Sequence, residues 1–355
     1  MASILEGSWF GGKPVQYFKF MRGGISWRYT SAAEPQMLDE EEYTPAVIKR
    51  GSIRQGSERG GQNVKVEVPS NLTVAGNWRP YSPSEEVKLL IRCKHRGEED
   101  TIVEFIGRAV GVIFKGDKLE LSCEPSHTNA RRKGGGRKWT IGCDLVLYEQ
   151  GMGLCNLDPG EVLTPATITE VGEITQTITA PEFANSPRSL TGGRIQWSVL
   201  EEVEGEMVEV ARNRTIVSQS GMTLTLDTFS DELVPGLEIL AFTKPLTVEA
   251  TITAITGLTL TAEAFTEYGD GRLAGGFIKW ITAAGLTEYR TIREHVGDQV
   301  TLDYGALDLA VDLVVTGYPG CAHNWAACGQ LENQPNYGGN LHMPIKNPYD
   351  GDPVW

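Results

Sequence analysis

Two stretches of the chain repeat each other, and this internal repeat limits the fold more than any other feature of the sequence. Residues 192–197 read GGRIQW, and residues 275–280 read GGFIKW. Downstream of them, RTIVSQSGMTLTLD is matched by RTIREHVGDQVTLD, and upstream TITEV is matched by TITAI. Self-similarity at this distance indicates a duplicated structural unit. We therefore predict two copies of one small β module, at residues 161–246 and 247–318.

Each copy reads as two short strands, a Gly-Gly corner, an amphipathic strand that ends in tryptophan, and a hairpin. This pattern predicts a small antiparallel barrel or sandwich of five or six strands. Gly192–Gly193 and Gly275–Gly276 are expected to form corners with positive φ angles. Trp197 and Trp280 suit either a core anchor or a platform on which a ligand stacks. Two modules are too few for a solenoid, so they suggest a duplicated spacer or docking domain.

The remainder of the chain also has the texture of a β protein. Short alternating runs such as VKVEV, KLLIRC and KLELSC are separated by turn residues, and the 41 glycines and 18 prolines fit many turns. YFKFMRGGISWRYTSA at residues 17–32 predicts a hairpin with a tight turn at Gly23–Gly24. We expect an all-β chain with few short helices. Its N-terminal β-rich domain covers residues 1–160, and a cysteine-bearing segment, residues 319–355, folds back on that domain.

Charge and hydropathy restrict the partners. The net charge of −14 argues against general nucleic-acid binding. One segment is strongly basic, SHTNARRKGGGRKW at residues 126–139, and it suits either a contact with a phosphate or an acidic partner or a solvated loop. The start of the chain lacks a secretory signal pattern, and no apolar run is long enough to cross a membrane. We therefore expect no membrane-spanning segment and a chain that folds in the cytoplasm with reduced thiols.

Sequence patterns of known catalytic sites are absent. GxSxG, HExxH and a GxGxxG after a strand do not occur, and the chain has five histidines. His295 in the second repeat is matched by Gln219 in the first, which argues against a role for His295 in a catalytic triad. His323 suits a metal ligand or an exposed loop residue. We expect no enzyme.

Reduced cysteines fill cores or bind metals, and the chain has six. Cys143 and Cys155 lie close together in the middle of the chain, and Cys321 and Cys328 lie near its end in GCAHNWAAC. Four thiolates suit Zn²⁺ or an iron–sulfur cluster on ligand type alone, and neither spacing is the C-x2-C of zinc knuckles or ferredoxins. Cys93, in KLLIRCKH, reads as a buried strand residue.

Three motifs occur in one order: FMRGGISWRYTSA, CDLVLYEQGMGLCNLDP, and PGCAHNWAACGQLENQPNYGGNLHMPIKNP. Together they resemble the tail-hub (baseplate hub) family of long-tailed bacteriophages and gene transfer agents. The resemblance implies a structural virion protein at the tail tip. It would join the distal tail protein and the tail tube to the central tip or fibre protein, with a lumen for the tape-measure protein. It also implies a homo-oligomer, expected to be a trimer, around the tail axis.

A more distant similarity to the lambda-type minor tail protein L implies a [4Fe–4S] cluster held by four cysteines. The ligands it implies here are Cys143, Cys155, Cys321 and Cys328, with Zn²⁺ as the alternative. Met152 stands where the family pattern places the second cysteine, so Cys155 takes that role and Cys123 is the reserve ligand. Cys321 and Cys328 are then not expected to form a disulfide.

Two other functions compete with the hub. A host-surface carbohydrate-binding protein would use the aromatic residues of the two modules. A redox or iron–sulfur enzyme would need a polar substrate site, which the sequence does not show, and a cluster with four cysteine ligands has no open coordination position.

Overall fold

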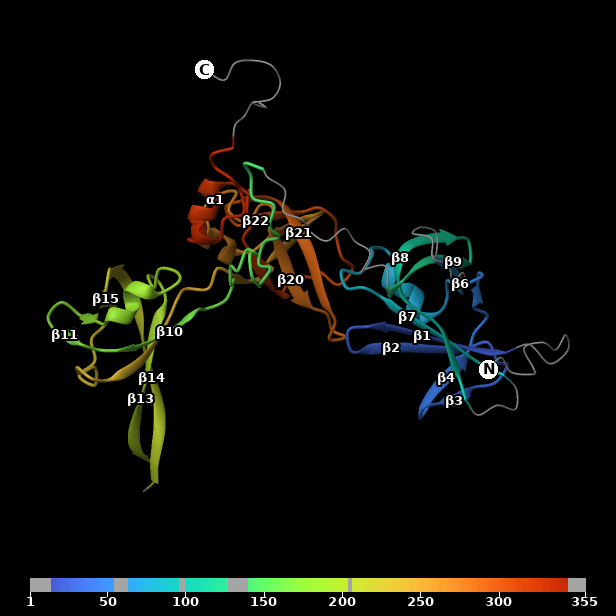
Figure 1. Cartoon of the computed structure of the whole chain (residues 1–355), viewed down its shortest axis with the longest axis horizontal. Helices are drawn as coiled ribbons and strands as arrows, with labels where there is room; N and C mark the ends of the chain where they lie inside the picture. The colour runs from blue at the N-terminus through green and yellow to red at the C-terminus, as the bar shows by residue number, and fades with distance from the viewer. Residues whose placement is uncertain (1–13, 54–62, 96–99, 127–139, 204–205, 344–355) are drawn as a thin grey trace, which may run out of the picture. The chain divides into compact units, whose positions relative to one another are not determined.

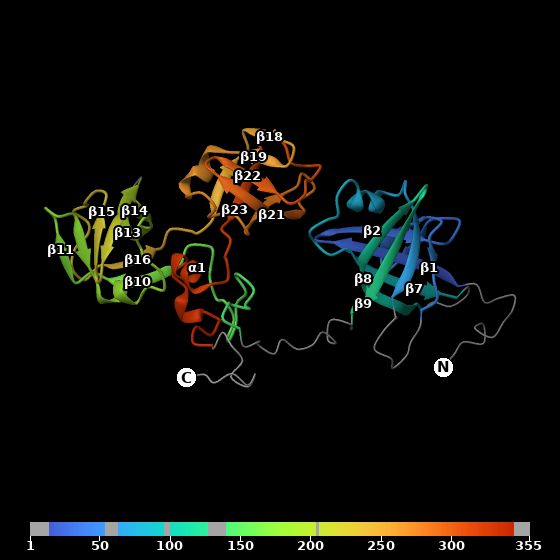
Figure 2. The ribbon, with the colours of Figure 1, turned by 90° about the horizontal axis from the view of Figure 1, so that it is seen from above.

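The computed structural model describes residues 14–53, 63–95, 100–126, 140–203 and 206–343 (Figures 1 and 2). Among these residues the strands form one sheet of nine strands and two sheets of seven. The all-β fold class is therefore confirmed. The chain divides into two compact units, Met1–Gly136 with Lys279–Arg290 and Asp303–Leu313, and Arg137–Ile278 with Thr291–Leu302 and Val314–Trp355.

The nine-stranded sheet belongs to the N-terminal domain and has the order β3-β4-β2-β1-β7-β8-β9-β6-β5. Its strands are β1 (Val15–Arg22), β2 (Ile25–Thr30), β3 (Gln36–Leu38), β4 (Glu41–Pro45), β5 (Lys49–Arg50), β6 (Val64–Pro69), β7 (Lys88–Lys94), β8 (Ile102–Lys115) and β9 (Lys118–Pro125). Alternation along the strands sends one face inward, as in β6, where Val64, Val66 and Val68 are buried. The 3-10 helix η2 (Thr73–Trp78) covers part of this core with Val74, Ala75 and Trp78.

The predicted N-terminal hairpin is confirmed. Strands β1 and β2 pair antiparallel from Tyr17 opposite Thr30 to Arg22 opposite Ile25. Gly23 at the turn has a φ of 52°, a conformation that glycine adopts without steric cost. Phe18 and Phe20 point inward and have no exposed surface, so the aromatic residues that made this stretch look like a hairpin also form its core.

The two seven-stranded sheets are copies of one another. Strand order is β10-β16-β13-β14-β15-β12-β11 in the first and β17-β23-β20-β21-β22-β19-β18 in the second, so each strand has an equivalent at the same place. The predicted duplication is confirmed. Each copy has seven strands and not five or six, because each carries an additional three-residue edge strand, β11 or β18.

The bounds of the first module are β10 (Leu163–Thr167), β11 (Glu170–Gly172), β12 (Thr177–Thr179), η4 (Pro181–Asn185), β13 (Arg194–Val203), β14 (Glu206–Ser220), β15 (Thr223–Leu226) and β16 (Glu238–Phe242). Those of the second are β17 (Val248–Thr251), β18 (Ala254–Thr256), β19 (Thr259–Thr261), η5 (Glu263–Glu267), β20 (Phe277–Ile281), β21 (Thr287–Val296), β22 (Gln299–Leu302) and β23 (Val314–Tyr318).

The Gly-Gly corners have the same geometry in both modules. Gly192 and Gly275 have φ angles of 76° and 75°, as the sequence predicted. The second glycine of each pair is needed for a different reason, which is close backbone approach. A Cβ atom on Gly193 would lie 1.9 Å from the carbonyl oxygen of Phe242, and one on Gly276 would lie 2.0 Å from that of Tyr318.

Both tryptophans are core anchors. Trp197 and Trp280 are 3% and 2% exposed and stand in the equivalent strands β13 and β20. The indole Nε1–H of Trp197 donates to the carboxylate of Glu232 at 2.9 Å, and that of Trp280 donates to Asp308 at 2.7 Å. A buried indole needs such an acceptor. Because neither ring face is open, the ligand-platform interpretation of these two residues is not supported.

Segment 140–160 and the C-terminal segment lie in the same unit. This differs from the predicted boundary, which placed residues up to 160 in the N-terminal domain. The C-terminal segment contains the helix α1 (Trp325–Gln330) and the 3-10 helix η6 (Gln334–Asn336). Both views show α1 beside the green segment that precedes β10 (Figures 1 and 2). The C-terminal segment thus folds back on residues 140–160, which carry Cys143 and Cys155.

Candidate cysteine site

Four cysteines meet where the middle and terminal motifs pack together. Cys143 and Cys155 come from the irregular segment 140–160, Cys321 follows β23, and Cys328 lies in α1. Together with Leu145, Leu157 and Leu331, three of these cysteines (Cys143, Cys155 and Cys321) belong to one small apolar cluster. None of the six cysteines, all of which are described, is in a disulfide. The structure therefore places Cys143, Cys155 and Cys321 in one cluster, with Cys328 near enough to interact with them electrostatically.

Backbone hydrogen bonds join the two motifs. The N–H of Cys143 donates to the carbonyl of His323 at 2.7 Å, and the N–H of Asn340 donates to that of Thr140 at 2.8 Å. Tyr337 donates its hydroxyl to the carbonyl of Ile141 at 2.8 Å. A Cβ atom on Gly339 would lie 2.4 Å from that same carbonyl oxygen, which explains why the terminal motif has a glycine there.

N–H groups surround the sulfur atoms. The Gly338 N–H donates to the Sγ atom of Cys143 at 3.4 Å, and the His323 N–H donates to that of Cys321 at 3.4 Å. The buried side-chain amide of Asn333 lies 3.5 Å from the Sγ of Cys155 and donates to its carbonyl at 2.7 Å. Hydrogen bonds to sulfur stabilise the thiolate form and tune clusters that thiolates hold.

The four thiols influence one another electrostatically. Burial, together with the charge that thiolates at Cys321, Cys143 and Cys155 would carry, raises the pKa of the Cys328 thiol to about 11. Burial also raises the pKa of Cys321, although the hydrogen bond from the His323 backbone opposes the shift. A metal group that bound Cys321 and Cys328 as thiolates would therefore have to displace their protons.

Backbone strain is concentrated at the same place. Four of the eight non-glycine residues that have positive φ in the described part of the chain belong to these two motifs: Tyr148, Asn156, His323 and Glu332. Such conformations cost about 1–3 kcal/mol each and occur mostly at functional sites. Tyr148 is held by a 2.6 Å hydrogen bond to the Pro319 carbonyl and by edge contacts with Phe277 and Tyr318.

The donor set fits a metal group, although its side chains do not stand in a closed ligand arrangement. Within residues 14–343, apart from the gaps given above, no three His, Cys, Asp or Glu side chains are placed as a metal site requires. Four soft sulfur donors, three of which (Cys143, Cys155 and Cys321) have hydrogen-bonded Sγ atoms, nevertheless match the chemistry that Zn²⁺ and iron–sulfur clusters select. His323 is exposed and contributes its backbone to the site.

Met152 and Cys155 differ in exposure, which favours Cys155 as the second cysteine of the expected ligand set. Met152 is fully exposed at the tip of a glycine turn, whereas Cys155 is 9% exposed and lies in the apolar cluster with Cys143 and Cys321. The reserve ligand, Cys123, is buried in the core of the N-terminal domain, where it faces Val64 on the paired strand. Burial there raises the pKa of its thiol to about 12. Cys93 is buried in β7, as its sequence context suggested.

His295 holds a turn in the second module. Its Nε2 atom lies 3.2 Å from the carbonyl oxygen of Phe265 and 3.1 Å from that of Gly297. In the first module the side-chain amide of Gln219 donates to the carbonyls of Phe183 and Gly221, at 2.9 and 3.2 Å. The two side chains make the same bridge between a 3-10 helix and a hairpin turn, which accounts for the residue match in the repeat.

We expect His295→Gln to fold with a free energy of unfolding within about 1 kcal/mol of the wild type, because glutamine restores the bridge. His295→Ala removes the donor shared by these two carbonyls, which leaves the Phe265 carbonyl with the N–H of Tyr268 alone, and should lose about 2 kcal/mol. Urea unfolding measures both, and Gln219→Ala in the first module is the matched control, expected to lose a similar amount. Equal losses for His295→Gln and His295→Ala would show that the imidazole has a role beyond this bridge.

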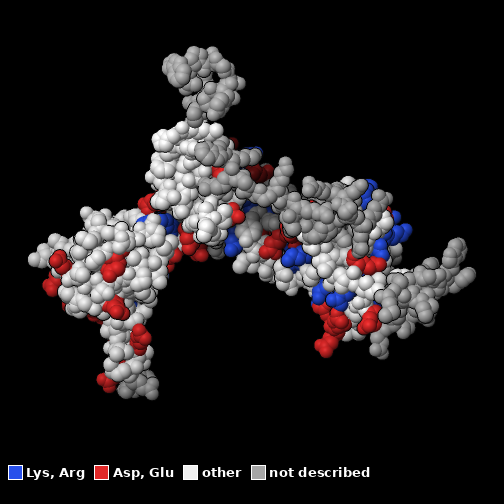
Figure 3. All heavy atoms as spheres, viewed as in Figure 1, with Lys and Arg blue, Asp and Glu red and all other residues white. Residues whose placement is uncertain are grey.

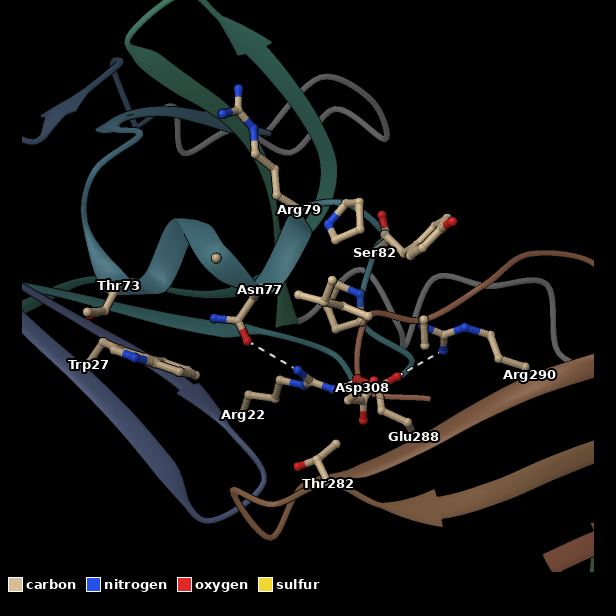
Figure 4. A pocket seen from close by; sticks show the side chains of 16 residues that line it. Arg22, Trp27, Thr73, Asn77, Arg79, Ser82, Thr282, Glu288, Arg290 and Asp308 are labelled. Atoms are coloured by element: carbon tan, nitrogen blue, oxygen red, sulfur yellow. Dashed lines mark hydrogen bonds and ion pairs between the residues drawn. The ribbon is translucent and has the colours of Figure 1, made fainter. Parts of the chain in front are cut away.

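A buried ion-pair network was missed by the sequence analysis (Figure 4). Arg22 of β1 pairs with Glu288 of β21, and Glu288 also pairs with Arg290 at 2.9 Å. Ser84 donates its hydroxyl to Glu288 at 2.7 Å, and Arg22 donates to Asn77 at 3.2 Å. Arg22, Asn77, Glu288 and Arg290 border a hollow of about 250 Å³. Charged residues in an alternating strand are normally predicted to be exposed. The sequence signal for a buried pair was that Arg212 stands in the first repeat at the position of Glu288.

The remaining expectations concern membranes and nucleic acids. In the described part of the chain no helix has the length and apolarity to cross a membrane. On the face shown in Figure 3, Lys and Arg lie near Asp and Glu and form no large basic patch among the described residues. Residues 127–139 of the basic segment lie outside the described residues.

Comparison with known proteins gives three similarities. Residues 271–347 match the family described as phage conserved hypothetical protein BR0599. An uncharacterized protein of Xylella fastidiosa (strain 9a5c) is 29% identical over 170 residues, which cover 44% of this chain and 35% of that protein. The chain thus spans about a third of the length of this relative. A chain in the virion of a native gene transfer agent particle aligns over 96% of this chain and 92% of its own, at 12% identity and a TM-score of 0.45.

The family match covers part of the second module and the terminal cysteine segment. It confirms the resemblance to phage proteins for this part of the chain. Residues 271–347, including Cys321 and Cys328, are therefore similar to a domain that is conserved in phages.

Proposed function

We propose that the protein is a structural component of a phage-like tail, a hub adaptor at the tail tip. It would be assembled in the host cytoplasm and would join the distal tail protein and tail tube to the central tip or fibre protein, around a lumen for the tape-measure protein. A homotrimer around the tail axis suits this position, because ring components close through heterologous interfaces. The observation that carries the proposal is the phage-conserved match over residues 271–347, which includes the terminal motif that packs on Cys143.

The cysteine site has a structural role in this proposal. Cys143, Cys155, Cys321 and Cys328 would hold a [4Fe–4S] cluster, with Zn²⁺ as the alternative metal. When bound, the cluster supplies covalent cross-linking and, in principle, electron storage. The residues of the chain provide the thiolates, the N–H groups that stabilise them, and an apolar wall of Leu145, Leu157 and Leu331. This anchors the C-terminal segment to residues 140–160 without a disulfide.

The alternatives have less support. A redox enzyme needs a substrate site beside the cluster, and the side chains packed around these sulfurs are mainly leucines, with Tyr148 and Asn333. The hypothesis of a carbohydrate-binding tail protein depends on exposed aromatic residues in the modules, but Trp197 and Trp280 are buried. A glycan array with the purified chain tests this second alternative directly.

The hub proposal is tested by electron microscopy of purified protein mixed with tail tubes that lack their tips. We expect negative-stain images with threefold density at one end of each tube and none along its side. Cys93→Ala, which alters a buried strand residue outside the cysteine site, is the control that should bind like the wild type. Random attachment along the tubes, or no attachment, contradicts the hub role while leaving the metal site open to its own test.

A further inference from the structure

The first module differs from the second in one long hairpin. Sixteen residues lie between Trp197 and Arg214, whereas nine lie between the equivalent Trp280 and Arg290. The additional residues lengthen β13 and β14 into an arm that projects from the module (Figure 1). The equivalent short hairpin of the second module carries Glu288, which forms the buried ion pair with Arg22 of β1. The duplicated hairpin edge is therefore a surface that this chain already uses for docking.

The arm is acidic and partly apolar. Between Ser198 and Ala211 there are five glutamates and no lysine or arginine. The register places Leu200 opposite Glu209 and Glu202 opposite Met207, so these four side chains share one face. Leu200 and Met207 are 64% and 63% exposed. In the space-filling view, the arm shows carboxylates and no basic atoms (Figure 3).

A groove continues this face onto the body of the module. It has a volume of about 560 Å³ and is lined by Glu182, Glu209 and Glu238 together with Gln196 and Leu240. Pairing of Gln196 with Leu240 puts both residues on the face of Leu200. One carboxylate oxygen of Glu182 is buried without a hydrogen-bond partner in the described part of the chain. An acceptor left without a donor in an acidic groove is suited to a cationic side chain.

The second module has lost these charges. At the positions of Glu182 and Glu238 it has Ala264 and Val314, and Glu209 belongs to the residues that the shorter hairpin lacks. The fold of the module therefore does not require the carboxylates, because a close copy forms without them. Exposed apolar side chains among like charges are typical of an interaction surface whose partner has the opposite charge.

We propose that the outer face of the first module, from the Glu182–Glu238 groove to Leu200 and Met207 on the arm, docks the basic segment 126–139 of a second copy of this chain. That segment contains Arg131, Arg132, Lys133, Arg137 and Lys138 and no acidic residue, and it is the one strongly basic stretch of an otherwise acidic protein. These charges are opposite in sign to those of Glu182, Glu202, Glu209 and Glu238 on the proposed face. A contact between two different surfaces of identical chains is heterologous and leads to rings or chains of subunits.

The first test is a direct titration. A fluorescently labelled peptide with the sequence of residues 126–139 is titrated with the full chain at low salt, and its anisotropy is followed. Glu182→Gln/Glu209→Gln/Glu238→Gln should weaken binding at least tenfold. The matched control Glu170→Gln/Glu173→Gln/Glu263→Gln removes the same charge from exposed positions outside the groove and should change binding less than twofold. Equal losses in both variants mean unspecific attraction and overturn the proposal.

The second test separates two copies from one. The wild-type chain should self-associate in sedimentation runs if one copy docks on another. We expect the groove variant to lose this self-association, and likewise a segment variant, Arg131→Gln/Arg132→Gln/Lys133→Gln. Their mixture should form heterodimers, because the intact groove of one meets the intact segment of the other. Failure of the mixture to associate overturns docking between copies. Neither result depends on binding to tail tubes, so this inference and the virion proposal can fail separately.

Discussion

Protein purified without oxygen should be brown and contain iron and sulfide, and Cys328→Ser should be colourless. The serine hydroxyl does not replace a thiolate as a ligand of a soft metal, so one substitution opens the four-cysteine set. In the proposed site the metal group would connect residues 140–160 to the terminal segment, so its loss would remove folding energy from both. Limited proteolysis should then cleave after residue 319 at least tenfold faster than in the wild type. Iron analysis, visible absorption and mass spectrometry of the fragments give the readouts.

The control is Cys93→Ala, since Cys93 is buried in the N-terminal sheet. It should keep the colour and the protease resistance of the tail. Cys123→Ala is a second control that discriminates the reserve ligand from Cys155, because it should keep its iron while Cys155→Ala loses it. Colourless wild-type protein with one zinc per chain would correct the metal and keep the ligands. A Cys321–Cys328 disulfide in protein kept anaerobic throughout would contradict both.

Glu288→Ala should lower the free energy of unfolding by about 3–5 kcal/mol, the usual cost of removing one partner from a buried ion pair. The side chains of Glu288, Arg22 and Arg290 are 7%, 6% and 3% exposed, so the substitution leaves two guanidinium groups buried without their carboxylate. Urea unfolding followed by tryptophan fluorescence is the measurement. The control Glu86→Ala removes a half-exposed partner of Arg108 and should cost less than about 1 kcal/mol. Equal losses in the two variants would show that the network contributes no more than a surface pair.

The same network predicts an acid dependence. Burial by itself raises the pKa of Glu288, but the hydrogen bonds from Ser84 and Arg290 and the charge of Arg22 more than offset it, so the pKa lies below its ordinary value. A lowered folded-state pKa stabilises the protein above the unfolded value of about 4.3, and this contribution is lost as pH falls through the folded pKa. The stability difference between wild type and Glu288→Gln should therefore be constant near neutrality and shrink below about pH 4. A difference that grows on acidification would contradict the assignment.

The two modules show which structural features a sequence repeat can predict. Two stretches that place Gly-Gly, an inward tryptophan and a hairpin at the same spacing must bury the same face, and so they adopt the same strand order. The Gln219 and His295 pair could be interpreted as structural for this reason, since one position tolerates either residue. Trp197 and Trp280 were ambiguous in the sequence, because exposure decides between a platform and an anchor, and exposure depends on strands far away in the chain.

The cysteine site was partly determined by sequence. The motifs and their resemblance pointed to Cys143, Cys321 and Cys328, because glycine, asparagine and cysteine at set positions reflect local turns and N–H donors such as that of Gly338. The position of the fourth thiol depended on a glycine turn that exposes Met152 and buries Cys155. Only the tertiary structure showed that segment 140–160 packs with the terminal motif and that Cys123 lies in another core.

Sequence by itself therefore determined the all-β class, the duplicated module, the N-terminal hairpin and the cysteines worth considering, since each depends on local periodicity or on a repeated pattern. Tertiary structure alone decided the Arg22–Glu288 network and the acidic groove at Glu182 and Glu238. Whether a charged side chain is solvated or buried depends on which distant strand lies opposite, and the alternating pattern of one strand carries no information about its partner. A long-range contact of this kind becomes visible only when the chain has folded.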